Sequence, residues 1–268
     1  MTPGKLTVRD LIQGRGSVQR TNVFVETARE AAAAEEAGID IITVDGRILT
    51  PAIRRAAANT FCIGGLAFGH LATTDDYLRA ACEMYEQGVD AFYCAAGPST
   101  VERLAEDRLP VVGHVGLIPW HMTWTGGWKA VGKTVDTALD VWRQVRRLED
   151  AGAFAAEIEV VPVEIATEIA RRSSLFLISM GSGPGCHAQY LFSEDILGIN
   201  SWRYPRHSKR YVDLAAEEDR LQARRVEAYA AYISEVRSGT FPGLEHVIAA
   251  DTEVVAAFRD HLERDSTA

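Results

Sequence analysis

The chain has 268 residues, 47% of them apolar and 24% charged, which is the balance of an ordinary globular protein and excludes a disordered, collagenous or disulfide-rich class. The net charge of -9 argues against nucleic acid or an anionic membrane surface as a partner, because binding phosphate groups needs concentrated Lys and Arg. No apolar run is long enough to cross a membrane, the four cysteines lack metal-site spacing and the N-terminus lacks a signal-peptide core, so we expect a cytoplasmic protein with reduced thiols.

Helices and short strands are predicted to alternate along most of the chain. A helix over residues 27–38 ends at a glycine, and a β-branched strand follows over 40–44. The pattern then predicts strands at 60–66, 91–95, 110–114, 154–159 and 175–180, and helices at 74–88, 99–106, 134–152 and 163–172. Residues 116–133 and 181–199 are predicted to be long loops. Amphipathic helices are predicted over 214–239 and 251–264.

This alternation predicts the fold class. Short strands separated by helices pair in parallel through helical crossovers. Six or seven such units favour an α/β fold of the closed (β/α)8 type over an open doubly wound sheet. We expect residues 1–268 to form one barrel domain, with C-terminal helices that cover the barrel or meet a neighbouring subunit. Side chains on the loops after the strands are then the candidates for chemistry, namely Asp45, Gly65, the segment 93–96, His114, Glu159 and the loop from Gly181.

Several motifs occur in order along the chain. They are GHVGLIP at 113–119, GGWKAVGKT at 126–134 and AGAFAAEIEVVP at 151–162, with AEEAGIDIITVDG before and GSGPGCHAQYLFSEDILGI and EVRSGTFPGLEH after them. Together they resemble the ketopantoate hydroxymethyltransferase family of the phosphoenolpyruvate mutase/isocitrate lyase barrel superfamily, over residues 6–248. The resemblance implies a (β/α)8 barrel, a small-molecule substrate and self-association into a homo-oligomer, as the family assembles into decamers.

The resemblance also implies a chemistry. In that family Mg²⁺ holds a 2-oxo acid, a Glu removes the proton next to the carbonyl, and the enolate attacks the methylene group of methylene-tetrahydrofolate. Glu159 matches the base, His114 the histidine of the substrate pocket, and Asp45 one metal-binding Asp. The second metal-binding Asp falls at Gly65, so we expect magnesium binding to be weak or absent. The family Lys and Glu of another strand end fall at Tyr93 and at Ala95.

The replacements predict a different way to stabilise an enolate. Arg47 can bind a substrate carboxylate, although it can equally pair with Asp45 alone. Tyr93 can donate a hydrogen bond to an enolate oxygen, or simply fill the strand end. Glu157 and Glu159 share one face of a strand. There their repulsion would raise one pKa, or the pair would jointly bind a cation, or Glu157 would bond a Lys or Arg of the barrel interior.

Further substrate-binding candidates are Gly46, Gly65 and Trp120, the last in an aromatic loop that lines a pocket or a subunit contact. We expect an enzyme that forms or breaks a C–C bond next to the carbonyl of a small carboxylic substrate, with Glu159, His114 and Tyr93 as catalytic residues. A lyase or isomerase of the wider superfamily, in a specialised pathway, is the alternative enzyme. A catalytically inactive barrel that binds a metabolite is the alternative from another class.

Overall fold

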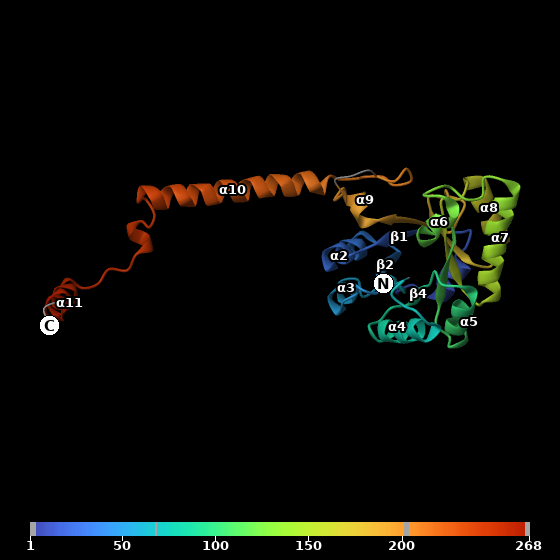
Figure 1. The fold of residues 1–268 in the computed structure, drawn as a ribbon, viewed down its shortest axis with the longest axis horizontal. Coiled ribbons are helices and arrows are strands. Elements are labelled where there is room, and N and C mark those ends of the chain that lie inside the picture. The colour runs from blue at the N-terminus through green and yellow to red at the C-terminus, as the bar shows by residue number, and fades with distance from the viewer. Residues whose placement is uncertain (1–3, 68, 201–203, 266–268) are drawn as a thin grey trace. The chain divides into compact units, whose positions relative to one another are not determined.

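The computed structural model describes residues 4–67, 69–200 and 204–265. The chain forms two compact units, Met1–Asp213 and Leu214–Ala268. The first unit holds a β-barrel surrounded by helices, and the second holds two α-helices and a short 3₁₀ helix (Figure 1).

Eight parallel strands close into a barrel in chain order, each paired with the next and β8 with β1. Their bounds are β1 Arg20–Phe24, β2 Ile41–Asp45, β3 Phe61–Gly65, β4 Ala91–Tyr93, β5 Val111–Gly116, β6 Ala155–Glu159, β7 Phe176–Met180 and β8 Ala188–Phe192. This arrangement confirms the predicted α/β fold of the (β/α)8 type.

Side chains on each strand alternate between the barrel interior and the surrounding helices. On β2, Ile41 belongs to the interior cluster, whereas Ile42 belongs to the cluster between strands and helices. Large buried side chains such as Phe61 and Phe176 fill the interior near the strand N-termini. The inward positions near the C-terminal ends are polar instead, beginning with Asp45, and this change in residue type places the candidate site at that end.

The helix α1 (Val8–Gln13) closes the N-terminal end of the barrel. Its Leu11 is buried and packs in the same interior cluster as the strand residues. A capping box fixes the start of α1, because the Thr7 side chain accepts from the Asp10 N–H while the Asp10 carboxylate accepts from the Thr7 N–H. The barrel interior is therefore filled at this end.

Helices follow the strands around the barrel, with α2 beside α3, α4 beside α5 and α5 beside α7 (Figure 1). Threonine capping boxes start α2 at Thr27, α4 at Thr73 and α7 at Thr134. The bounds are α2 Ala28–Ala37, α3 Pro51–Ala56, α4 Thr74–Glu86, α5 Pro98–Glu106, α7 Val135–Asp150 and α8 Val163–Arg172. All except α3 lie within a residue or two of the predicted helices.

The two predicted loops contain regular structure. Residues 181–199 include β8 and the short helix α9 (Ser193–Leu197), so the prediction of a continuous loop there was wrong. The pattern AQYLF is short and follows a glycine-rich turn, which concealed the strand. Residues 116–133 include a 3₁₀ turn, η1 (Pro119–His121), and the short helix α6 (Met122–Thr125).

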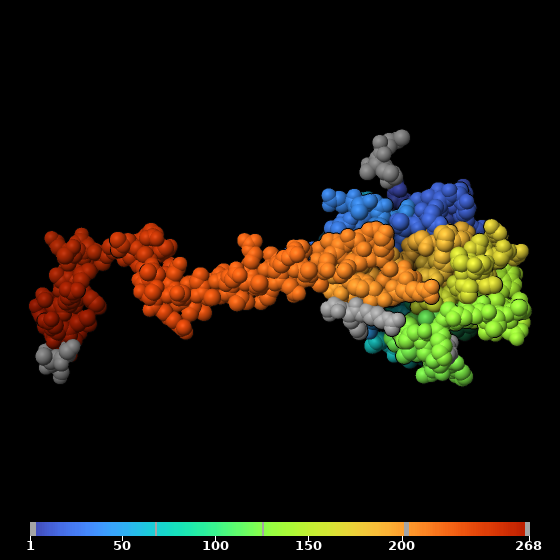
Figure 2. All heavy atoms as spheres, turned by 90° about the horizontal axis from the view of Figure 1, so that it is seen from above, coloured from blue at the N-terminus to red at the C-terminus, as the bar shows by residue number. Residues whose placement is uncertain are grey.

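The second unit comprises α10 (Leu214–Ser238), η2 (Leu244–His246) and α11 (Thr252–Asp265), which confirms the two predicted C-terminal helices. Figure 2 shows α10 as a rod of atoms one helix wide. None of the described residues of this unit is buried. That these helices cover a barrel or contact a neighbouring subunit stays a prediction. Among the helices of the described residues, none combines the length and apolar character needed to traverse a bilayer.

Candidate active site

A cavity of about 920 Å³ opens at the C-terminal ends of the strands, where barrel enzymes carry their chemistry. The residues predicted to be catalytic or substrate-binding all line it except Gly46. Of the candidate segment 93–96 only Tyr93 is in the described lining, and the glycine loop 181–185 lies outside it. Its polar lining comes from Thr43, Asp45, Arg47, Tyr93, His114, Glu157, Glu159, Glu194, Asp195, Arg206 and His207. Its apolar lining includes Phe24, Leu66, Leu117, Trp120, Trp128, Met180, Tyr190, Phe192 and Tyr204. The predicted residues are thus brought together in one place.

His114 on β5 lies between two glutamates of β6. Its Nδ1 is 3.4 Å from Oε2 of Glu157, and its Nε2 is 3.3 Å from Oε2 of Glu159. Strand register produces this contact, because His114 pairs with Glu157 and Gly116 pairs with Glu159. All three side chains are buried. The two glutamates therefore share the inward face, and Glu157 faces a histidine rather than the Lys or Arg of the alternative interpretation.

Tyr93 on β4 contacts the same imidazole. Its hydroxyl oxygen is 2.7 Å from Nδ1 of His114. The other ring nitrogen, Nε2, is 2.9 Å from the carbonyl oxygen of Leu117, which can only accept a hydrogen bond, so Nε2 carries a proton. When Nδ1 is protonated as well, it donates to the Tyr93 oxygen. The Tyr93 O–H is then left to donate to a ligand in the cavity.

The charges of this cluster follow from its burial and its partners. Burial acts to lower the pKa of His114, but hydrogen bonds and charge from Glu157 and Glu159 outweigh it and raise that pKa to about 9. Burial raises the pKa of Glu157. Burial, followed by the charge of Glu157, raises the pKa of the Tyr93 phenol well above its usual range. At neutral pH the cluster therefore holds an imidazolium and a neutral phenol.

Asp45 at the end of β2 forms a bidentate ion pair with Arg47. The Arg47 Nε lies 3.0 and 3.1 Å from the two carboxylate oxygens, and Nη2 lies 2.6 Å from Oδ2. Burial acts to raise the pKa of Asp45, but hydrogen bonds and charge from Arg47 lower it below its usual range. The structural ion pair that the sequence left open is thus present.

The guanidinium of Arg47 still has donors to offer. Its side chain is 54% exposed, and its Nη1 lies 3.1 Å from Nε2 of His70. Of the five N–H groups, three are engaged by Asp45 and His70. Within the part of the chain that the structure describes, one N–H on each terminal nitrogen remains, which is the fork that a carboxylate accepts.

Two glycines join the ends of β2 and β3. The Gly46 N–H donates to the Gly65 carbonyl over 2.9 Å, and a Cβ on Gly46 would lie 2.8 Å from that oxygen. Gly46 lies outside the described lining of the cavity, and this packing accounts for the glycine without a ligand contact. Gly65 does line the cavity, and a Cβ there would meet Asp45 Cα at an ordinary 3.5 Å.

The aromatic loop, residues 116–133, contributes two of its tryptophans to the cavity lining. Trp120 and Trp128 line the cavity and are 58% and 67% exposed. Trp124 is 90% exposed and lies outside the described lining. The pocket interpretation therefore applies to Trp120 and Trp128, and the subunit-contact interpretation stays a prediction for Trp124.

The backbone after Glu159 is held in an unusual conformation. Val160 has φ 49°, a value that a β-branched residue rarely adopts. Its N–H donates to the Met180 carbonyl, and its own carbonyl accepts from the Val131 N–H. Ser182 of the glycine loop supports the same strand end, because its hydroxyl donates to the Ile158 carbonyl. This support fixes Glu159, and the sequence offered no signal for it.

The glycine loop and its Cys–His pair serve packing. A Cβ on Gly183 would lie 2.4 Å from Val163, and one on Gly185 would lie 2.0 Å from Thr167. Next to this loop, Nδ1 of His187 accepts from a backbone N–H over 2.8 Å. Burial lowers the pKa of His187 to about 4 and raises that of the Cys186 thiol to about 12. These values leave a neutral histidine and an unreactive thiol.

The side chains present do not fit a magnesium ion. Magnesium takes oxygen ligands in octahedral geometry. Both carboxylate oxygens of Asp45 are engaged by Arg47, and Gly65 has no side-chain oxygen to offer. Among the described residues, no three His, Cys, Asp or Glu side chains are grouped so as to hold a metal ion.

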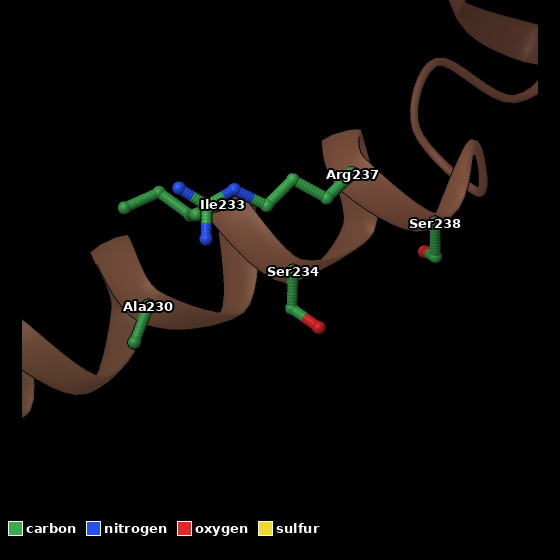
Figure 3. Close-up of a pocket in the computed structure, with 5 residues that line it drawn as sticks. All are labelled: Ala230, Ile233, Ser234, Arg237 and Ser238. Atoms are coloured by element: carbon green, nitrogen blue, oxygen red, sulfur yellow. The ribbon is translucent and has the colours of Figure 1, made fainter.

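A second hollow lies on α10. It is lined by Ala230, Ile233, Ser234, Arg237 and Ser238, all from that helix, and Figure 3 shows the Arg237 side chain extending along it towards Ile233. Side chains of a single helix cannot enclose a small molecule. The chemistry of the molecule is therefore concentrated in the barrel cavity.

Known proteins resemble this chain over most of its length. The family model of ketopantoate hydroxymethyltransferase matches residues 42–244. The chain belongs to the ketopantoate hydroxymethyltransferase family. The 3-methyl-2-oxobutanoate hydroxymethyltransferase of Pyrobaculum islandicum is 35% identical over 265 residues, covering 90% of this chain and 97% of the relative. That of Thermus thermophilus is 34% identical over 266 residues, covering 90% and 98%. The predicted family is confirmed.

Two solved structures resemble this chain in fold. A 2,3-dimethylmalate lyase, described as a member of the PEP mutase/isocitrate lyase superfamily, matches with a TM-score of 0.51 and 14% identity, covering 98% of this chain and 97% of the lyase. A phosphonomutase-like protein from Burkholderia cenocepacia matches with a TM-score of 0.55 and 13% identity, covering 68% and 89%. At these identities the likeness concerns the barrel alone.

Proposed function

We propose that this member of the ketopantoate hydroxymethyltransferase family forms or breaks a C–C bond next to the carbonyl of a small 2-oxo acid-like substrate, through an enolate. The observation that carries the proposal is the buried contact of His114 with Tyr93, Glu157 and Glu159 at the base of one cavity. A base and a hydrogen-bond donor facing one space are what enolisation needs.

Each residue has a defined part in this reaction. The Glu159 carboxylate takes the proton from the carbon next to the carbonyl, and the bonding electrons move to the carbonyl oxygen. The Tyr93 O–H donates to that oxygen, and the His114 imidazolium strengthens Tyr93 as a donor by donating to its oxygen. The Arg47 fork binds the substrate carboxylate. The enolate carbon then attacks an electrophile, or the reverse sequence cleaves the bond.

We propose that this enolisation proceeds without magnesium, because the donor set at Asp45 and Gly65 does not fit that ion. The family resemblance makes methylene-tetrahydrofolate the candidate one-carbon donor, and the cavity has room for a second reactant beside a small oxo acid. When bound, such a donor supplies the electrophilic carbon for the enolate.

Deuterium exchange into 2-oxo acids tests the proposal without requiring the second substrate. We expect the full chain in D₂O to exchange the C3 protons of a 2-oxo acid faster than buffer alone, and to keep doing so after exhaustive chelation. The Glu159→Gln variant should lose this exchange, while Glu164→Gln, on the exposed face of α8, serves as a matched control. Complete loss on chelation that is restored by Mg²⁺ would contradict the metal-free reaction.

The same assay separates the other interpretations. Unchanged exchange in Glu159→Gln would remove Glu159 as the base. Saturable binding of 2-oxo acids with no exchange under any condition would favour the inactive, metabolite-binding barrel. Exchange followed by cleavage rather than condensation would favour the lyase.

A further inference from the structure

The cavity has an aromatic wall that the proposed chemistry does not use. Phe24 ends β1 and Phe192 ends β8, and the two residues are paired in register where the barrel closes. Their ring centroids are 4.8 Å apart, and the Tyr190 ring stacks on Phe192 with centroids 5.5 Å apart. All three line the cavity. We call Phe24, Tyr190 and Phe192 the aromatic wall.

The wall presents apolar surface to the cavity while its other side packs on the barrel core. Phe24 and Phe192 are half-buried and pack against the interior cluster, whereas Tyr190 is 4% exposed. The Tyr190 hydroxyl is hydrogen-bonded to Thr43. Burial raises the pKa of Tyr190 well above its usual range and outweighs the lowering effect of that hydrogen bond. The wall therefore offers ring faces, and a ligand that covers them removes apolar area from water.

The order of the strands places this wall across from the polar cluster. In a closed barrel of eight strands, β8 and β1 lie opposite β4 and β5, which carry Tyr93 and His114. Asp45 ends β2 and Arg47 follows it, opposite β6, which ends with Glu159. A 2-oxo acid with its carboxylate at Arg47 and its reacting carbon near Glu159 turns its carbonyl oxygen towards Tyr93. Its remaining substituent then points towards β8 and β1.

We propose that the substrate carries a large apolar or aromatic substituent on the reacting carbon, and that Phe24 and Phe192 select it. This inference rests on the proposed function and names its substrate class. The cavity supports it, because about 920 Å³ lies near the top of the roughly 300–1,000 Å³ of small-molecule sites, well above what a three-carbon oxo acid fills. The wall is a specificity device, since neither phenyl ring can move a proton.

The test compares oxo acids that differ only in this substituent. Isothermal titration calorimetry gives the affinity for pyruvate and for 2-oxo-4-phenylbutanoate, and the D₂O exchange assay gives their rates above the buffer background. We expect the phenyl compound to bind at least about tenfold more tightly, the factor that apolar pockets reach for added carbon atoms. The ratio of the two affinities should fall at least about fivefold in Phe24→Leu and in Phe192→Leu.

Phe154→Leu is the matched control. Phe154 packs against the same interior cluster but precedes β6 at the other end of the barrel and lies outside the described lining of the cavity. Equal affinity for the two acids in the wild type would overturn the inference. A preference for the phenyl compound that persists in both wall variants would also overturn it, and this is the result expected if the wall holds only a one-carbon donor. A preference that falls equally in Phe154→Leu would overturn it as well, because the loss would then not be specific to the wall. Selective binding without exchange would instead count against the proposed function while leaving the wall in place.

Discussion

Replacing Glu157 with Gln tests the electrostatics of the cluster most directly. The rise in the pKa of His114 from 6.5 to about 9 corresponds to about 3 kcal/mol in favour of the imidazolium. Glu157 and Glu159 lie at nearly equal distances, 3.4 and 3.3 Å, from the ring. Removing one negative charge therefore removes about half of the attraction, while the cost of burial remains. In Glu157→Gln we expect the pKa of His114 to fall from about 9 to below about 8.

Long-range ¹H–¹⁵N NMR of histidine-labelled protein, titrated from pH 5 to 10, measures this directly. His187, whose pKa is lowered to about 4 by burial, is an internal control that should stay neutral in both proteins throughout the titration. A wild-type His114 that is neutral at pH 7.5, or a variant that still titrates near 9, would refute the reasoning.

Glu157→Gln should also change how the free energy of unfolding depends on pH. A raised histidine pKa contributes stability that is fully present below the unfolded value of 6.5 and is lost as the pH rises through about 9. His114 should therefore cost the wild type about 3 kcal/mol of unfolding free energy between pH 6.5 and pH 9. Urea denaturation should show a smaller loss over that window in Glu157→Gln. An equal loss in both proteins would mean that Glu157 does not hold the charge on His114.

Three further predictions concern the rest of the molecule. Tyr93→Phe should lower the rate of C3 exchange about 100-fold with little change in oxo acid affinity, since it removes an enolate donor, and an unchanged rate would assign the donor elsewhere. The double variant Gly65→Asp/Arg47→Ser should bind Mg²⁺ detectably by calorimetry, because a side chain at position 65 fits and Asp45 is released from Arg47. Mg²⁺ binding by the unmodified protein would contradict the conclusion that its side chains do not fit the ion. Sedimentation of the full chain should give a mass above 29.3 kDa, because α10 and α11 expose apolar side chains throughout, and a pure monomer would remove the predicted homo-oligomer.

Local patterns were sufficient to predict the barrel. The strands are short and apolar, and several helices have clear signals at their ends, such as Thr73 at the start of α4 and Gly38 at the end of α2, whose backbone is left-handed with φ 82°. The rule that chemistry follows the strands then selected Asp45, His114 and Glu159. Both steps rest on local sequence; the barrel is confirmed, and the three selected residues line one cavity, while their catalytic roles stay predictions.

Contacts between strands were not predictable in the same way. That His114 bridges two glutamates depends on the register of β5 against β6, and no spacing within one strand encodes that register. The wall residue Phe192 is not found from the sequence, because β8 follows a glycine turn and its short pattern predicts a loop. Ser182 was missed because its role, a hydrogen bond to the end of β6, joins residues that are far apart in the chain.

Leu11 and the interior cluster close one end of the barrel, and this closure determines the order in which substrates bind and products leave. With the N-terminal end of the barrel filled, reactants and products share the mouth at the strand C-termini. A molecule seated at Glu159 lies at the bottom of this well, so a second reactant binds above it and blocks its exit. We therefore expect compulsory-order kinetics for a two-substrate reaction, with the oxo acid binding first and its product leaving last.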